Sequence, residues 1–442
     1  MNFKSIFKIA VPIMIGNVIN QIQMLIDKAF LGQVNELYLS SLGNVSTPMW
    51  ASMSVCFSIV TGASIIISQK VGAKDTKDVE KYASSLLLWS NVFPIFLFFV
   101  WHFFGQQIFI ALGTKGIVLD FCMDYLKYFK PIILLIGLEA STMVIMQTSN
   151  HTKPMLFFGI IRAGLNVILD YVLIFGKFGF QPMGIKGAAI ATTIAEFAGV
   201  AFSMLIFISS RHMPTRPPLG AVLKASLRPY LKSSKLGLPT ALEDFAWNLG
   251  NIVLIKFLND ISMVAAGIYG AILSIELIAV SCIAGVGSGT LTLCSEAVGA
   301  CNIKKYKSTA LCAYIICFSI SILTLGFCLV FPKQIISIFT KETEIIAVCG
   351  LYLILMCCNL YGKSGNIILG NAIRGSGNTR WMLCTQIFGT IFISGCAFVF
   401  VKILKWGIAG VYAAVITDEL VRCGINYIKY RSILKRIEIK AA

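Results

Sequence analysis

The stretch "SQKVGAKDTKDVEK" at residues 68–81 recurs as "SEAVGACNIKKYKS" at residues 295–308, at an offset of 227 residues. The same offset relates three further pairs, which are Pro12 and Pro239, Gly43 and Gly270, and Tyr125 and Tyr352. Several matches in order at one offset indicate an internal repeat rather than chance. The sequence therefore predicts two halves that fold alike.

The composition is typical of a membrane protein. Of the 442 residues, 57% are hydrophobic and only 13% are charged, whereas a soluble domain carries roughly 25% charged residues. Apolar stretches of about 20 residues, the length that crosses a bilayer, recur along the chain. We therefore predict an all-α polytopic membrane protein. Its twelve predicted spans lie near residues 8–31, 45–69, 85–106, 124–147, 155–176, 184–209, 236–257, 264–292, 308–331, 348–371, 381–402 and 407–428.

The two halves contain six predicted spans each. An even number of spans makes both halves enter the membrane in the same direction, so the repeat is parallel, with its axis along the membrane normal. We predict an N-lobe at 1–210, a cytoplasmic linker at 211–235 and a C-lobe at 236–442 that ends in a basic cytoplasmic tail. Two such six-helix bundles enclose a cleft, which is an architecture of transporters.

The positive charge of the chain lies between the spans. The formal net charge is +17, and the Lys- and Arg-rich segments follow spans two, six, eight and twelve. All of these segments fall on the side of the N-terminus, so the positive-inside rule places both termini in the cytoplasm. The charge is therefore expected to orient the chain in a plasma (inner) membrane, and we expect no nucleic-acid partner.

Four segments carry a resemblance to a known family. They are "VPIMIGNVINQIQMLIDKAFLG" (11–32), "SQKVGAKD" (68–75), "GIKGAAIAT" (184–192) and "RGSGNTRWM" (374–382). Together they resemble the multidrug and toxic compound extrusion (MATE) family, and the resemblance covers nearly the whole chain. It implies twelve helices in two six-helix lobes. It also implies export of organic cations and other amphipathic compounds, driven by an inward flow of protons or sodium ions.

The resemblance also implies a coupling site. Asp27, Asn166 and Asp170 match the N-lobe ion site of the prokaryotic branch that includes the DNA-damage-inducible members. Other branches have an acidic residue on the seventh helix where this chain has Trp247, and another where it has Asn378. We therefore expect no C-lobe ion site of that type.

Asp27 in span one and Asp170 in span five also stand out on physical grounds, because an ionisable side chain in a span costs ~2.5–3.5 kcal/mol on insertion scales. Asn166 precedes Asp170 by one helical turn, on the same face. Such a group can hold a proton, because burial and a like charge favour a neutral carboxyl, or it can offer oxygen ligands to a sodium ion. Asp27 could instead pair with Lys28 or cap a helix end. At the offset of the repeat, the residue that corresponds to Asp27 is Leu254, so the scaffold shared by the two halves does not require an acid at this position.

Other polar side chains in the predicted spans are candidates for substrate binding. Gln23 and Asn20 lie in span one, and Glu139 lies in span four without an evident partner. Glu276 in span eight and Lys363 in span ten have two interpretations: they form a structural ion pair, or they contact a substrate.

Pro12 and Pro239 lie near the starts of spans one and seven and are gating candidates. A proline inside a helix frees a backbone carbonyl and allows bending, although a proline is also tolerated at a helix N-terminus. We interpret Arg162 as a positioning charge on the cytoplasmic side.

These observations favour transport over catalysis. The three histidines are scattered and no Walker-type loop is present, so we expect no enzyme, no ATP-driven pump and no cofactor beyond the coupling ion, H+ or Na+. We expect no metal beyond Na+ at Asp27, Asn166 and Asp170. We predict a secondary active antiporter that exports small amphipathic, cationic organic compounds by alternating access, as a monomer in the lipid bilayer. The alternative is a lipid-linked oligosaccharide precursor flippase of the same superfamily, in which Lys363 would bind pyrophosphate.

Overall fold

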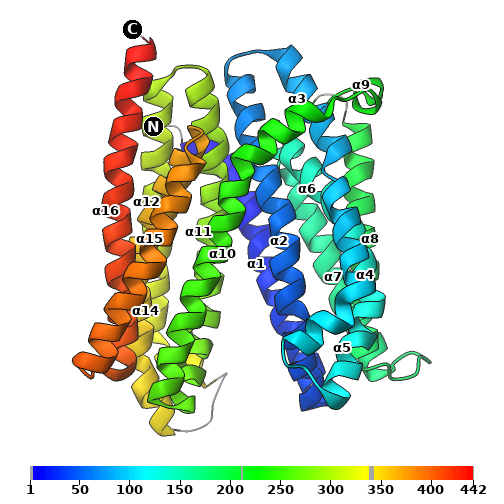
Figure 1. Ribbon diagram of the computed structural model, residues 1–442, viewed down its shortest axis with the longest axis vertical. Helices are drawn as coiled ribbons and strands as arrows, with labels where there is room; N and C mark the ends of the chain where they lie inside the picture. Colours follow the sequence, from blue (N-terminus) through cyan, green and yellow to red (C-terminus); the bar gives the residue numbers. More distant parts are fainter. Residues whose placement is uncertain (1–2, 211–212, 338–342, 442) are drawn as a thin grey trace. The chain divides into compact units, whose positions relative to one another are not determined.

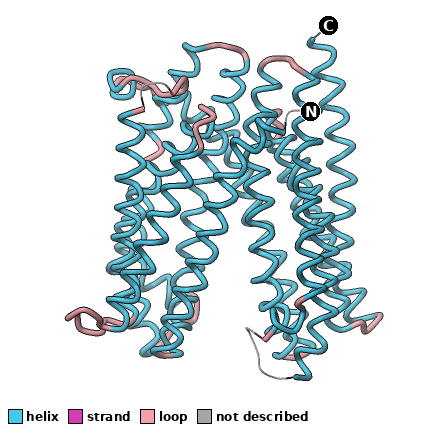
Figure 2. The backbone as a smooth tube through the Cα atoms, turned by 180° about the vertical axis from the view of Figure 1, so that it is seen from behind, coloured by secondary structure: helices cyan, strands magenta, loops and turns pink. Residues whose placement is uncertain are grey.

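The computed structural model describes residues 3–210, 213–337 and 343–441. Helices make up nearly all of these residues, and the described part of the chain contains no β-strand. Figure 2 shows helices along nearly the whole described chain, with loops only as connections between them. The predicted all-α class is therefore confirmed.

The first half of the chain contains the helices α1 (Phe3–Val34), α2 (Glu36–Gly72), α3 (Thr76–Trp89), α4 (Val92–Ala111), α5 (Gly116–Phe129), η1 (Lys130–Ile132), α6 (Ile133–Thr148), α7 (Lys153–Phe175), α8 (Ile185–Ser209) and α9 (Leu219–Leu223). The second half contains α10 (Leu227–Ile261), α11 (Met263–Gly299), α12 (Ile303–Val330), α13 (Pro332–Ile336), α14 (Thr343–Gly375), α15 (Thr379–Ala397), η2 (Phe398–Ile403) and α16 (Gly407–Ala441). Figure 1 labels most of them.

The predicted spans fall in these helices. Within the described residues, nine helical segments are long and apolar enough to cross a membrane by length and composition. The other three predicted spans lie in α10, α14 and α16, which are 35, 33 and 35 residues long. Of these, α10 and α16 include basic segments that lie outside the predicted spans. α16 runs through the predicted C-terminal tail, which is therefore helical.

The segment 211–235, predicted as a linker, is partly helical. Its first two residues lie outside the described part of the chain. The rest includes α9 and the first turns of α10, and it is held by hydrogen bonds to α3. Ser85 Oγ donates to the Ser226 carbonyl at 2.7 Å, and Trp89 Nε1 donates to the Ala225 carbonyl at 3.0 Å. The segment is thus fixed to the first half of the chain.

The described chain divides into two compact units. The first unit comprises Met1–Met14, Ser68–Lys74 and Pro239–Ala442, and the second comprises Ile15–Ile67 and Asp75–Leu238. Both α1 and α10 therefore contribute residues to both units: α1 changes unit after Met14, and α10 changes unit at Pro239. The lobe boundary at 211–235 stays a prediction.

Close helix contacts recur at the offset of the repeat. In the second unit, a Cβ atom added at Gly62 of α2 would overlap the backbone of Ser233 and Gly237 in α10. In the first unit, the matching residues Gly289 of α11 and Ala10 of α1 are also in contact. Small residues permit such close approach of helices in a membrane. The scaffold contacts thus follow the internal repeat.

A reciprocal contact joins the end of α2 to the end of α11 within the first unit. An added Cβ at Gly72 would overlap the backbone of Glu296, and an added Cβ at Gly299 would overlap the backbone of Gln69. At the offset of 227 residues, Gly72 corresponds to Gly299 and Gln69 corresponds to Glu296, so the two parts of this contact are equivalent in the repeat. Gln69 Nε2 also donates to the Gly375 carbonyl at 2.8 Å. These contacts explain why the repeated stretch at 68–81 keeps small residues at matching positions.

Large apolar side chains cover much of the outer surface. In α4, Phe96, Phe99, Phe103 and Phe104 are each more than half exposed. Such a surface is unfavourable in water, but it is the surface expected of a helix that faces lipid. The second unit also has an apolar core, built around residues such as Leu31, Trp101 and Phe109.

We expect Gly62→Ala to lower the free energy of unfolding by about 1–3 kcal/mol, because the added methyl group would push α2 away from α10. Gly43 lies in the same helix and has no atom within 4 Å of an added Cβ. Gly43→Ala should therefore be neutral or stabilise the helix by ~0.5–1 kcal/mol. Thermal unfolding of the purified proteins measures both effects, and equal melting temperatures for the two variants would contradict the close packing.

Candidate functional site

Helices α1 and α7 each carry a row of polar side chains at helical spacing. The row in α1 is Asn20, Gln23 and Asp27, and the row in α7 is Arg162, Asn166 and Asp170. Residues three, four or seven positions apart share one helix face. All six residues belong to the second unit. The two rows interact side chain to side chain.

The position of α7 follows from its sequence. The helix has Pro154 in its first turn, and it ends at Gly176, whose φ of 67° favours glycine. α7 packs against α8, where an added Cβ at Gly187 would overlap the backbone of Leu173. This close packing buries Asn166 and Asp170 completely, both at 0% exposure.

Asp27, Asp170 and Asn166 come together as predicted. The Asp27 carboxyl interacts directly with Asp170 and with Gln23, and the Asp170 carboxyl interacts with Asn166. Asp27 lies inside α1, which continues to Val34, so it does not cap that helix. Its carboxyl group interacts with Asp170 and Gln23, while the neighbouring Lys28 is exposed.

Two further side chains complete this group. Asn166 Nδ2 donates to Thr192 Oγ1 in α8 at 3.3 Å. Tyr125 of α5 is buried and interacts with both carboxyl groups and with Thr192. Sequence reasoning did not identify Thr192 or Tyr125, because neither residue type is unusual in an apolar span.

The oxygen atoms of this group lack hydrogen-bond donors. Among the described residues, no donor reaches the buried atoms Gln23 Oε1, Asp27 Oδ1, Asn166 Oδ1, Asp170 Oδ1 and Asp170 Oδ2. Two ionised carboxylates cannot hydrogen-bond to each other, because both are acceptors only. A buried acceptor without a donor is costly. A proton shared by the carboxyl groups, or a hard cation among the oxygens, would satisfy the group.

Arg162 organises a second group at the other end of the α7 row. Its Nη1 lies 3.2 Å from Glu196 Oε2, and its Nη2 donates to Asn20 Oδ1 at 2.6 Å. Glu139 of α6 interacts with both Arg162 and Glu196. The predicted substrate candidates Asn20 and Glu139 thus surround an arginine, and Glu139 has the partners that the sequence did not reveal.

The interpretation of Arg162 as a positioning charge on the cytoplasmic side stays a prediction, but the structure gives this residue partners inside the protein. Its guanidinium lies inside the second unit, and its side chain is only 19% exposed. It also acts electrostatically on Asp27. The available signal was its spacing, because Arg162, Asn166 and Asp170 follow one another at intervals of four residues.

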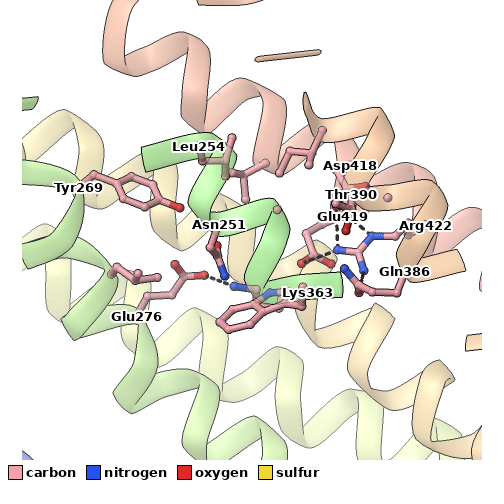
Figure 3. A pocket seen from close by; sticks show the side chains of 16 residues that line it. Asn251, Leu254, Tyr269, Glu276, Lys363, Gln386, Thr390, Asp418, Glu419 and Arg422 are labelled. Carbon is pink, nitrogen blue, oxygen red and sulfur yellow. Dashed lines mark hydrogen bonds and ion pairs between the residues drawn. The ribbon is translucent and has the colours of Figure 1, made fainter. Parts of the chain in front are cut away.

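The first unit contains a pocket with two groups of charged side chains. On one side, Lys363 Nζ lies 2.7 Å from Glu276 Oε1, and Asn359 Nδ2 donates to the same oxygen at 2.9 Å. Figure 3 shows this pair and, apart from it, the group around Arg422. Glu276 and Lys363 therefore form an ion pair. Their role in substrate binding stays a prediction.

The sequence suggests that Glu419 pairs with Arg422, but Asp418 and Gln386 were not identified as members of this group. Arg422 Nη2 lies 2.7 Å from Asp418 Oδ2 and 3.1 Å from Glu419 Oε1, and Nη1 donates to Gln386 Oε1 at 2.7 Å. Gly389 provides the space, because an added Cβ there would overlap Arg422. The signal for this group was the spacing of Asp418 and Arg422 by one helical turn in α16.

The two prolines lie inside helices. Pro12 follows the start of α1 by nine residues, and Pro239 follows the start of α10 by twelve. Both are also buried. Because they lie beyond the first turn of their helices, neither is the N-terminal proline that a helix tolerates. Each lies close to the residue at which its helix passes from one compact unit to the other. Their role in gating stays a prediction.

The part of the chain that the structure describes contains no group of three or more His, Cys, Asp or Glu side chains placed to hold a metal ion. The oxygen-rich group around Asp27 and Asp170 differs from such a site, because its other members, Gln23, Asn166, Thr192 and Tyr125, carry amide or hydroxyl groups. It suits a proton or a weakly bound monovalent ion.

Comparison with known proteins gives consistent matches over most of the chain. The sequence model of the MatE family matches residues 12–172 and 239–422. The "Probable multidrug resistance protein NorM" of Thermotoga maritima is 26% identical, over 99% of this chain and 95% of its own length. The "Multidrug export protein MepA" of Staphylococcus aureus is also 26% identical, over 58% of each chain.

A solved structure has the same fold. It is described as the outward-facing conformation of a multidrug resistance MATE family transporter of the MOP superfamily. Its TM-score is 0.90 at 20% sequence identity, and the match covers 98% of this chain and 96% of that one. This likeness concerns the fold alone, and it confirms the predicted helical architecture.

We expect Lys363→Met to lower the free energy of unfolding by about 3–5 kcal/mol, because it leaves the Glu276 carboxylate buried without its cation. The double variant Glu276→Gln, Lys363→Met should recover most of that loss, which thermal unfolding in detergent can measure. The matched control is Asp260→Asn, which removes an acid from the exposed pair of Asp260 with Lys402 and should change stability little. Equal melting temperatures for the single and double variants would contradict the ion-pair assignment.

Proposed function

Because the chain belongs to the MatE family, we propose that it is a secondary active antiporter. In this proposal it exports small amphipathic, cationic organic compounds in exchange for an inward flow of H+ or Na+. The relatives named above, a multidrug resistance protein and a multidrug export protein, support the direction and the type of substrate. We infer that this chain is likewise a transporter and not an enzyme.

The observation that carries the proposal is the group of buried oxygens without donors around Asp27 and Asp170. In a low-dielectric interior, two neighbouring carboxylates strongly favour uptake of a proton or a cation. Asp27 lies on α1 and Asp170 on α7, so occupancy changes the interaction between two helices. Coupling requires such a difference between the states of the protein.

The proposed cycle has three steps. A cationic compound enters from the cytoplasm while Asp27 and Asp170 carry negative charge. In the outward-facing state a proton or sodium ion binds the two carboxyl groups, removes negative charge and favours release of the compound. The return step then carries the ion inward. Thus the ion and the substrate bind in alternation.

We infer a role for the two helix-interior prolines in this cycle. A proline lacks the N–H that would bond to the preceding turn, and its ring displaces the carbonyl of that turn. Helix bends concentrate at such positions. Pro12 and Pro239 lie where α1 and α10 pass between compact units, so bending there would let the remainder of each helix change direction.

The flippase alternative receives less support from the charges. Binding of a pyrophosphate needs unpaired cationic groups. Lys363 is paired with Glu276 at 2.7 Å, and the pocket that contains it has more acidic than basic side chains. We therefore retain export of organic cations, by a monomer in the plasma (inner) membrane with both termini in the cytoplasm.

Asp27→Asn and Asp170→Asn should each reduce ion-driven efflux about tenfold or more, in line with typical coupling free energies, because an amide can neither take up a proton nor offer a negative charge. The measurement is efflux from vesicles containing the purified protein, with proton and sodium gradients imposed independently. The gradient that drives wild-type efflux identifies the coupling ion.

Lys28→Gln is the matched control, since Lys28 neighbours Asp27 in α1 but its side chain is exposed. It should transport as the wild-type protein does. Efflux by Asp27→Asn at the wild-type rate under both gradients would show that the coupling site lies elsewhere.

A further inference from the structure

Two glutamates meet beside Arg162, away from the group around Asp27 and Asp170. Glu196 of α8 is only 6% exposed, and no donor among the described residues reaches its Oε1. Its Oε2 lies 3.2 Å from Arg162 Nη1. The carboxyl group of Glu139 in α6 interacts directly with that of Glu196. Two ionised carboxylates are acceptors only, so this contact is favourable when one of the two groups carries a proton.

The balance of charge also calls for a proton here. Glu139 and Glu196 would together carry two negative charges, and Arg162 supplies one positive charge. An uncompensated charge in a low-dielectric interior is unfavourable. One proton on the two glutamates leaves a single negative charge, which Arg162 balances. The three side chains are therefore neutral as a set when they hold one proton.

The guanidinium of Arg162 is held in place from three directions. It lies over the ring of Phe158, at 5.4 Å from the ring centroid, and its Nη2 donates to Asn20 Oδ1 in α1 at 2.6 Å. Gly199 lies one turn after Glu196 in α8, and an added Cβ there would be 3.4 Å from Arg162 Cβ. These contacts leave the guanidinium little freedom to move. Arg162 therefore positions a fixed positive charge beside the two glutamates.

The glutamate pair is separate from the group around Asp27 and Asp170 but linked to it. Arg162 precedes Asp170 by eight residues in α7, which is about 12 Å along the helix at 1.5 Å per residue. Asp27 nevertheless acts electrostatically on Arg162. In the orientation proposed above, α7 begins on the cytoplasmic side. The glutamate pair then lies nearer the cytoplasm than Asp170 does.

The other helices packed here leave this assignment unchanged. α8 packs against α5, α6 and α7, and α6 packs against α3 and α4 (Figure 1). Among the described residues, the titratable side chains that act on Glu139 are Glu196 and Arg162, and those that act on Arg162 are these two glutamates and Asp27. α3, α4 and α5 contribute none to either list. The charge balance of the pair therefore depends on Arg162.

We propose that Glu139 and Glu196 form a second proton-binding site, with Arg162 as its positioning residue. Binding forms one O–H bond on a glutamate carboxyl group, and release gives the proton back to water without any redox change. The fixed guanidinium repels a sodium ion, so the ion that binds here is H+. The role of the site in the transport cycle rests on the proposed function, whereas the proton site itself does not. In that cycle, a proton bound here leaves to the cytoplasm.

Infrared spectroscopy of the purified full-length protein tests the proton site directly. A protonated carboxyl group absorbs apart from an ionised one, and 13C in the carboxyl group of glutamate shifts the glutamate bands alone. At neutral pH an exposed glutamate is ionised. We expect a label-sensitive band of a protonated glutamate in the wild-type protein at neutral pH. Its absence would overturn the proposal without any need for a variant.

Variants assign the band to this pair. Glu139→Gln should remove it, because the remaining carboxylate of Glu196 is then balanced by Arg162 and stays ionised. Asp27→Asn should retain it, since the label reports glutamate only. The matched control is Glu80→Gln, which removes an exposed glutamate of α3 and should also retain the band. An unchanged band in Glu139→Gln, with a wild-type melting temperature, would place the protonated glutamate elsewhere and overturn the assignment.

The pH at which the band disappears tests the role of Arg162. Arg162→Gln should move that pH upward, because the pair loses the cation that stabilises its ionised form. Arg162→Lys keeps the positive charge and should bring the pH back toward the wild-type value. A purely structural role would not predict this recovery. The same pH in the wild-type protein and in Arg162→Gln would show that Arg162 does not act on the pair.

Transport by vesicles tests the role in the cycle. Proton-driven efflux should fall about tenfold or more in Glu139→Gln, in line with typical coupling free energies. Exchange of labelled for unlabelled compound moves no net proton and should continue at the wild-type rate, whereas a misfolded variant would lose both activities. Wild-type efflux by Glu139→Gln under a proton gradient would exclude the pair from the cycle.

The two proposals fail separately. If an imposed gradient drives wild-type efflux but the spectra contain no protonated glutamate, the second proton site is wrong and the antiporter assignment stands. If no gradient drives efflux while Glu139→Gln removes the band, the antiporter assignment fails and the proton site stands.

Discussion

The constraint on which this structure depends is that a charge inside an apolar protein needs a partner. In water an isolated carboxylate is solvated at no cost, but among apolar helices it must find a cation, a set of donors or a proton. The described chain meets this requirement with four buried or largely buried arginines and lysines. They are Arg162 with Glu196, Lys363 with Glu276, Arg374 with Glu243, and Arg422 with Asp418 and Glu419.

Some buried carboxyl oxygens do not follow this pattern of pairing. Asp27 and Asp170 interact directly, and no donor among the described residues reaches Asp27 Oδ1 or either oxygen of Asp170. Asp418 keeps one oxygen free although Arg422 engages the other. A fully paired network would be a rigid structural element. An incompletely paired one is sensitive to whatever ion or donor arrives, which is a property that a transporter needs and that a purely structural core avoids.

The internal repeat separates scaffold from function. Contacts between backbones, such as Gly72 with Glu296 and Gly299 with Gln69, recur in both halves. Pro12 and Pro239 also match, and both lie inside long helices. Asp27 does not follow the repeat, because the residue at the matching position of the second half is Leu254. Duplication therefore supplied two similar bundles, and substitutions within each bundle supplied different polar interiors.

By itself, the sequence determined the helices, the repeat and the candidate residues Asp27, Asn166 and Asp170. Helix formation depends on local hydrogen bonds and on apolar periodicity, both of which can be read along the chain. The tertiary structure decided which polar rows meet. Arg162 comes to lie between Glu196 and Asn20, and Asp418 comes to line a pocket with Glu276, because of how far each helix is rotated about its axis and how closely small residues let it approach. Those quantities depend on contacts between residues far apart in the chain, so neither the spacing nor the composition of one helix could reveal them.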